Sequence, residues 1–201
     1  MNLWRPMTLC LCAAALTPTA ALSEDSKFEI FDSNISVAEV LKTQSAWCNA
    51  LLTISRDYRS GGISKAKATA ARVIDTAYAY QYGPVAFKPT LTSGQQTFRT
   101  SREGALAYFV GHNPNYPSDT GFALKPWGSC AIDNKVIQLN GSSAITMGNV
   151  KLTTLSGKVT TVDKTWSFMR ESDGQVRIVL HHSSLPVSYT HLRAHETLRY
   201  L

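Results

Sequence analysis

Residues 129–184 read SCAIDNKVIQLNGSSAITMGNVKLTTLSGKVTTVDKTWSFMRESDGQVRIVLHHSS, and this stretch decides the fold. It is rich in β-branched residues, which favour strands. Its apolar runs are separated by Asn140-Gly141, Ser156-Gly157 and Asp173-Gly174, and each of these pairs is a hairpin turn signal. The pattern predicts four consecutive antiparallel strands, over 129–139, 144–154, 158–170 and 175–184.

The chain before this meander predicts two helices. Ser36 and Glu39 have the spacing of a capping box, so a helix is expected from Val37 to about Tyr58. Ser60-Gly61-Gly62 ends it, and a second helix is expected from Ser64 through Tyr80. The apolar residues that recur on one face of the first helix are Val40, Leu41, Trp47, Leu51 and Ile54.

Shorter elements are expected between the helices and the meander. Strands over 85–90 and 96–100 form a predicted hairpin, joined through Ser93-Gly94. A short helix over 102–109 is capped by Ser101, residues 112–120 form a loop, and a strand follows over 122–125. Helices followed by an antiparallel meander predict an α+β domain. A curved sheet around the N-terminal helix resembles the nuclear-transport-factor-2-like, or SnoaL-like, cone.

The first 23 residues have the features of a secretory signal peptide. Arg5 supplies the basic start, Met7–Leu16 is a short apolar run, and Ala21 and Ser23 are small residues before the predicted cleavage. The run is shorter than the roughly 20 apolar residues of a membrane span. We therefore predict a bacterial protein exported to the periplasm or secreted, with no membrane attachment after cleavage. Residues 24–35 are a polar lead-in to a domain over 36–186.

The end of the chain resembles one reading frame through a sequencing-library adapter. The resemblance covers Pro186–Thr197, so residues 187–201 are predicted to be non-native. A genuine polar tail is the alternative. His191 and His195 have the helical spacing of a metal-ligand pair, and this interpretation removes them from any site.

Composition narrows the classes of partner. The chain carries 20 Lys and Arg against 14 Asp and Glu, for a formal net charge of +6, and the basic residues are dispersed. Nucleic-acid binding surfaces concentrate basic residues, so no nucleic-acid partner is predicted. A mildly positive field suits a small anion.

Two cysteines remain after the predicted cleavage, Cys48 and Cys130. An even pair in an oxidising compartment indicates a disulfide. Two buried free thiols are an equally good interpretation of the same pair. Metal ligation is disfavoured because the spacing is not CxxC.

Eight segments carry a resemblance to a known family: AWCNALL at 46–52, AYQYG at 79–83, FKPTLT at 87–92, QTFR at 96–99, GALAYFVG at 104–111, TMGNV at 146–150, TVDKTW at 161–166 and IVLHHSSLP at 178–186. Together and in this order they resemble the bacterial iota-class carbonic anhydrases. These are related to the association domain of calcium/calmodulin-dependent kinase II. Many members have three histidines before the paired serines, whereas this chain has Leu180 before His181 and His182.

The resemblance implies reversible hydration of CO2 to bicarbonate and a proton. In members described as metal-free, a threonine, a tyrosine and a serine hold the bicarbonate. By motif these fall on Thr90, Tyr108 and Ser183, and Ser184 is predicted beside them as a further substrate-binding residue. Other members are described as using zinc or manganese, so the resemblance leaves the metal question open.

Elementary geometry argues against a zinc site built from histidines. Such a site needs three protein ligands and one open position. Neighbouring strand residues face opposite sides, so His181 and His182 cannot enter one pocket, and His112 lies in a loop. No metal ligands are therefore predicted. The same alternation puts Val179, His181 and Ser183 on one face, which makes His181 the predicted proton-transfer group.

Two other classes of function fit the same fold. The chain is alternatively a non-catalytic SnoaL-like module that binds a small ligand, or an oligomerisation module, because fold alone does not determine function. For the carbonic anhydrase, the open sheet predicts a homodimer, whereas an oligomerisation module would form a larger ring.

Overall fold

The structure is a computed structural model, and it describes residues 32–186. The predicted signal peptide (1–23), most of the predicted lead-in and the predicted non-native segment (187–201) lie outside the described residues.

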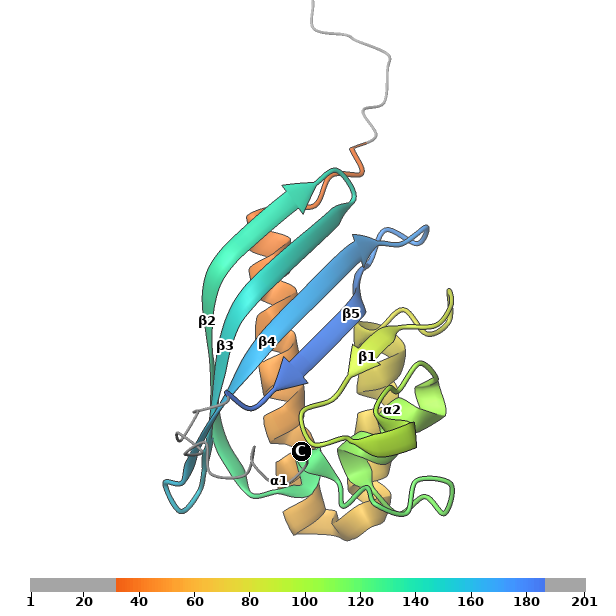
Figure 1. Cartoon of the computed structure of the whole chain (residues 1–201), viewed down its shortest axis with the longest axis vertical. Helices are drawn as coiled ribbons and strands as arrows, with labels where there is room; N and C mark the ends of the chain where they lie inside the picture. The colour runs from red at the N-terminus through yellow and green to blue at the C-terminus, as the bar shows by residue number, and fades with distance from the viewer. Residues whose placement is uncertain (1–31, 187–201) are drawn as a thin grey trace, which may run out of the picture. The chain divides into compact units, whose positions relative to one another are not determined.

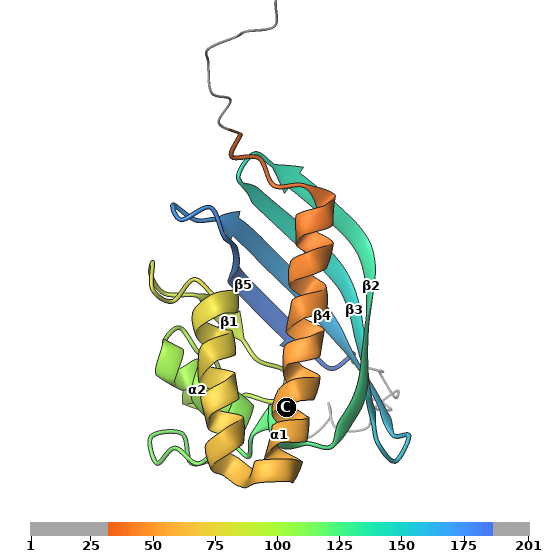
Figure 2. The same ribbon diagram turned by 180° about the vertical axis from the view of Figure 1, so that it is seen from behind.

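Five strands form one open, curved sheet in the order β1-β5-β4-β3-β2. The strands β2 (Trp127–Asn140), β3 (Ser143–Thr154), β4 (Val159–Arg170) and β5 (Val176–Ser184) are antiparallel neighbours, as the turn signals predicted. The short β1 (Ala86–Lys88) pairs in parallel with β5. Figures 1 and 2 show the sheet curving around the first half of helix α1. The predicted α+β, nuclear-transport-factor-2-like fold is confirmed.

Helix α1 (Val37–Ala77) contains both predicted helices. It begins at the capping box of Ser36 and Glu39 and is interrupted at Gly62, whose φ of 68° suits a residue without a Cβ. The second half returns beside the first (Figure 2). The predicted break is thus a reversal of direction, and the helix ends before Tyr80. Leu41 is 46% exposed, so its assignment to the buried face was wrong.

Helix α2 (Arg102–Val110) begins as expected, since the Ser101 side chain accepts a hydrogen bond from the Gly104 N–H. The predicted hairpin over 85–90 and 96–100 is wrong. Residues Gly94–Gln96 form a 3-10 turn, η1, and β1 is a single short strand. Pro89 has no N–H to continue the ladder, which ends β1 at Lys88.

The predicted strand over 122–125 is also wrong. Phe122–Leu124 form a second 3-10 turn, η2, and all three residues are buried. A short apolar run has no periodicity that distinguishes a strand from a buried turn. Among the described helices, none combines the length and apolar character that crossing a bilayer requires.

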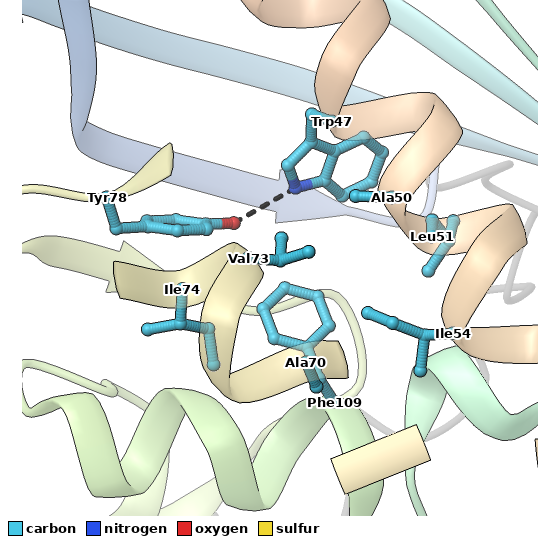
Figure 3. Close-up of a pocket in the computed structure, with 9 residues that line it drawn as sticks. All are labelled: Trp47, Ala50, Leu51, Ile54, Ala70, Val73, Ile74, Tyr78 and Phe109. Atoms are coloured by element: carbon cyan, nitrogen blue, oxygen red, sulfur yellow. Dashed lines mark hydrogen bonds between the residues drawn. The ribbon is translucent and has the colours of Figure 1, made fainter. Parts of the chain in front are cut away.

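A small apolar cavity lies between the two halves of α1 (Figure 3). It encloses about 10 Å³ and is lined by Leu51, Ile54, Ile74 and Phe109, with Trp47 and Tyr78 at one end and Ala50, Ala70 and Val73 completing the wall. A water molecule needs roughly 10–15 Å³ and polar partners. This cavity is therefore a packing void in the core.

A disulfide between Cys48 and Cys130 joins α1 to β2. Their Cα atoms are 5.5 Å apart, and the bond closes a loop of 82 residues. The bond holds the first half of α1 against β2, the edge strand farthest from β1, next to Trp47 of the core.

Replacing both cysteines by alanine should lower the free energy of unfolding by about 2–4 kcal/mol, because the unfolded chain regains the entropy of the closed loop. Urea unfolding under oxidising conditions measures this loss. A reductant should destabilise the wild type by a similar amount and leave the double variant unchanged. Equal stability of the two oxidised proteins would contradict a stabilising cross-link.

Candidate functional site

Strand β5 carries the central residues of the site. Its ladder with β4 pairs Leu180 with Ser167 and Ile178 with Phe168, so Val179 is an extra, bulged residue. The bulge places Ile178, rather than the predicted Val179, on the buried face together with His181 and Ser183. His181 is 2% exposed and Ser183 is 1% exposed.

Three hydroxyl groups that are distant in sequence lie together at the end of β5. Thr90 follows β1 and its hydroxyl donates to Ser183 Oγ at 2.7 Å. Tyr108, on α2, is 5% exposed, and its hydroxyl has no hydrogen-bond partner among the described residues. The structure thus brings these predicted residues into one region from three different elements.

The Tyr108 hydroxyl is electrostatically suited to donate a hydrogen bond. Burial raises the pKa of this phenol well above its usual range, although the nearby side chain of Thr90 and backbone of Leu91 oppose the shift. The group therefore keeps its proton at neutral pH. A cavity of about 30 Å³ adjoins the Tyr108 side chain and is also lined by Leu91 and residues 118–122.

Lys88 supplies positive charge at the edge of this region. It is partly buried on β1, and its Nζ donates to the backbone carbonyl of Ser183 at 3.1 Å. The bond fixes the end of β5 against β1 and leaves an ammonium group near the hydroxyls.

His181 is held at both ring nitrogens. Its Nδ1 lies 2.8 Å from the Tyr78 hydroxyl, and its Nε2 lies 2.6 Å from Lys164 Nζ. The Trp47 indole N–H donates to the Tyr78 oxygen at 3.0 Å, which Figure 3 shows. The Phe87 ring stacks on the imidazole with ring centroids 4.5 Å apart. These contacts fix the ring in place, and almost none of it is exposed to solvent.

Burial controls the protonation of this network. It lowers the pKa of Lys164 to about 7. It also holds the pKa of His181 well below the usual value of 6.5, and the neighbouring Lys164 adds to this effect. Burial raises the pKa of Tyr78. Each of these groups therefore favours its uncharged form more than it would in water.

Three other predicted or considered residues lie apart from the hydroxyls. Ser184 is opposite the exposed Asp163 in the β4–β5 ladder. Its side chain therefore faces the outer side of the sheet, away from the side chain of Ser183. His182 and His112 are both exposed. Within residues 32–186, no group of three or more His, Cys, Asp or Glu side chains is arranged to hold a metal ion.

The family description of metal-independent carbonic anhydrases matches residues 38–185 of this sequence. The chain belongs to this family. The metal-independent carbonic anhydrase of Nostoc sp. strain PCC 7120 is 46% identical over 202 aligned positions, which cover 92% of this chain and 98% of that protein. The crystal structure of a cyanobacterial iota-carbonic anhydrase, complexed with bicarbonate, is 52% identical. The matched region covers 81% of this chain and 99% of the chain in that crystal structure, with a TM-score of 0.79.

This membership confirms the sequence-based prediction of a carbonic anhydrase. It favours an enzyme over the alternative of a non-catalytic binding or oligomerisation module. The roles predicted for individual side chains in this carbonic anhydrase are taken up below.

Sequence reasoning missed Lys164, although a signal was present. Along β4, Val162, Lys164, Trp166 and Phe168 occupy alternate positions and all are buried. The position of a lysine within an apolar series of period two indicates a side chain that faces the core. Lysine side chains are almost never fully buried, so this pattern is a weak signal for a lysine.

Replacing Lys164 by methionine should change how stability depends on pH. The folded-state pKa of about 7 lies below the usual lysine pKa of 10.5, so the unfolded chain binds more protons between these limits. Stability of the wild type should therefore rise with pH across this window, relative to Lys164→Met, by at most about 1.4 kcal/mol per pH unit. Below pH 7 the burial penalty on the charged lysine is fully present, and the variant should be more stable.

Urea unfolding of both proteins at several pH values between 6 and 10 gives the two curves. Lys151→Met, on the exposed face of β3, is the matched control and should run parallel to the wild type. Parallel curves for Lys164→Met as well would show that burial does not perturb this lysine.

Proposed function

We propose that this carbonic anhydrase hydrates CO2 at the cluster formed by Thr90, Tyr108 and Ser183. The observation that carries the proposal is the buried Tyr108 hydroxyl, which has no partner within the described residues and lies beside the Thr90–Ser183 hydrogen bond. A buried donor without an acceptor is costly, and a bound anion supplies the missing acceptor. The cyanobacterial relative was crystallised with bicarbonate, the product of this reaction.

The cluster would act on the oxygen atoms of the substrate. When water attacks the carbon of CO2, negative charge develops on the substrate oxygens. Thr90 then donates to a substrate oxygen in place of Ser183, and Tyr108 donates to another. Fixed donors in a dry site stabilise developing charge because they need no reorganisation during the reaction.

The proposed reaction does not require a metal ion. The family is described as metal-independent. The three histidines within residues 32–186 do not converge, because His181 is buried whereas His112 and His182 are exposed. Zinc and manganese, which the resemblance to the broader class left open, have no histidine cluster to hold them within residues 32–186. His181 keeps its predicted role in proton transfer as part of the proposal.

Thr90→Val, Tyr108→Phe and Ser183→Ala should each lower kcat/KM for CO2 hydration by about 10²–10³-fold, the typical effect of losing one donor to an oxyanion. A stopped-flow hydration assay on the purified full chain measures this. Thr161→Val, on the exposed face of β4, is the control and should retain activity. A metal chelator should leave wild-type activity unchanged.

Full activity in all three variants would remove the hydroxyl cluster from the mechanism. Activity that is lost with chelator and restored by zinc or manganese would instead require a metal.

We also propose that the protein is exported and acts in the periplasm as a homodimer. The Cys48–Cys130 disulfide supports an oxidising compartment. The outer face of the sheet supports self-association, since five apolar residues from β2, β3 and β4 are at least 41% exposed there: Val136, Ile145, Met147, Val159 and Met169. Exposed apolar patches of this kind are typical of protein interfaces.

Expression of the full chain in bacteria tests both points in one preparation. The protein recovered from the periplasmic fraction should begin at Glu24 and have twice the mass of one chain by light scattering. Ile145→Glu with Met147→Glu should yield a monomer. Protein retained in the cytoplasm would contradict export, and a wild-type monomer would contradict the dimer.

A further inference from the structure

Lys164 is an unusual residue for the interior of a protein. It is 4% exposed, and its one hydrogen-bond partner among the described residues is His181 Nε2. Its Nζ lies over two indole rings, 4.7 Å from the centroid of Trp47 and 5.2 Å from that of Trp166. Within the described part of the chain, none of the ion pairs includes it.

A buried ammonium group without a carboxylate partner is strongly disfavoured. The aromatic faces offset only part of this cost. The neutral amine avoids it and still has a partner, because its lone pair can accept from His181 Nε2–H while Tyr78 donates to Nδ1. Burial lowers the pKa of Lys164 to about 7, in agreement with an amine that is readily neutral.

The network has a second arrangement that holds one more proton. When Lys164 is an ammonium group it donates to His181 Nε2, and the ring hydrogen then resides on Nδ1 and faces the Tyr78 oxygen. The two arrangements use the same contacts between heavy atoms. The pair can therefore gain or lose a proton without moving the backbone.

This pair lies beside the proposed substrate site. Lys164 and Ser183 are directly opposite each other in the β4–β5 ladder, and both side chains face the interior. Opposed residues of this kind have Cβ atoms about 4.5–5.5 Å apart. An anion held by the Ser183 hydroxyl would thus have Lys164 as a close, desolvated cation.

We propose that Lys164 takes up the proton that hydration releases and becomes the counter-cation of the bicarbonate product. The proposal rests on the function assigned to the Thr90, Tyr108 and Ser183 cluster. The water oxygen forms a bond to the CO2 carbon, one C=O π pair moves onto its oxygen, and one water O–H bond breaks. The proton passes to the Lys164–His181 pair, where His181 orients the amine. The interior then holds one positive and one negative charge, and its net charge is unchanged.

Other titratable groups surround the pair and affect its protonation. His182 lies on β5 beside the pair, Tyr78 follows α1, Lys88 lies on β1 and Tyr108 on α2. Asp163 neighbours Lys164 in sequence but lies on the outer face of β4. Burial is what disfavours the charged form of Lys164, so a bicarbonate ion held beside it would favour its protonation.

Calorimetric titration of the purified full chain with bicarbonate tests the proposal. At pH 8.5, measurements in two buffers of different ionisation enthalpy give the number of protons taken up on binding. The wild type should take up close to one proton per bicarbonate. Lys164→Met should take up almost none and bind bicarbonate about 10–100-fold more weakly at pH 7, the effect of losing a nearby buried charge. Lys151→Met should behave as the wild type.

Lys164→Arg separates charge from proton uptake, because arginine remains protonated. It should bind bicarbonate with an affinity that does not change between pH 7 and 9, take up no proton and have a reduced kcat. Urea unfolding confirms that each variant is folded. If Lys164→Met keeps both the proton uptake and the affinity, the proposal is overturned.

Thr90→Val distinguishes this failure from failure of the proposed site. Weak binding in Thr90→Val with unchanged proton uptake in Lys164→Met would leave the hydroxyl cluster intact and remove only the lysine. Unchanged binding in Thr90→Val would place bicarbonate elsewhere, and the role of Lys164 would fail with the site.

Discussion

The parallel pairing of β1 with β5 is the contact on which the site depends. It involves three residue pairs, ending at Lys88 opposite His182. Thr90 comes two residues after the last pair and Ser183 comes one residue after it, so the short ladder delivers the two hydroxyls to the same place. Lys88 stabilises the pairing of β1 with β5, because its Nζ donates a hydrogen bond to the Ser183 carbonyl. Because β5 is held in register by its longer ladder with β4, a slip of one residue in the β1–β5 ladder would turn the buried Phe87 of β1 outward and move Thr90 away from Ser183.

The sequence predicted the local features of this fold and missed the distant pairings. Gly-containing turns and alternating residues predicted the meander and the shared face of His181 and Ser183, because both signals act between close neighbours in the chain. Strand β1 was predicted as half of a hairpin, since nothing local indicates that its partner lies over 90 residues away. The bulge at Val179 was missed for the same reason: it is set by the register with β4. The motif resemblance supplied Thr90 and Tyr108, which periodicity alone could not connect.

The buried network around His181 places a cost on folding that the packing around it must offset. Lysine, imidazole and phenol groups are each desolvated, and hydrogen bonds return only part of the lost hydration. The surrounding rings of Trp47, Trp166 and Phe87 fill the space and provide favourable faces for the cation and the imidazole. The disulfide anchors α1 next to Trp47 and so limits how far this assembly can loosen. Such a network is a poor choice for stability alone, as expected if it has the role in proton uptake proposed above.

Charge balance explains why hydroxyl groups alone are an incomplete site for this reaction. A zinc anhydrase uses the metal charge both to acidify water and to hold the anion that forms. Hydroxyl donors can orient an anion, but they carry no net charge and cannot absorb the released proton. A basic group that is neutral before the reaction and cationic after it performs both tasks, provided that it is buried and close to the anion. Lys164 satisfies these conditions through its position opposite Ser183, its contact with His181 and its lack of an ion pair within the described residues.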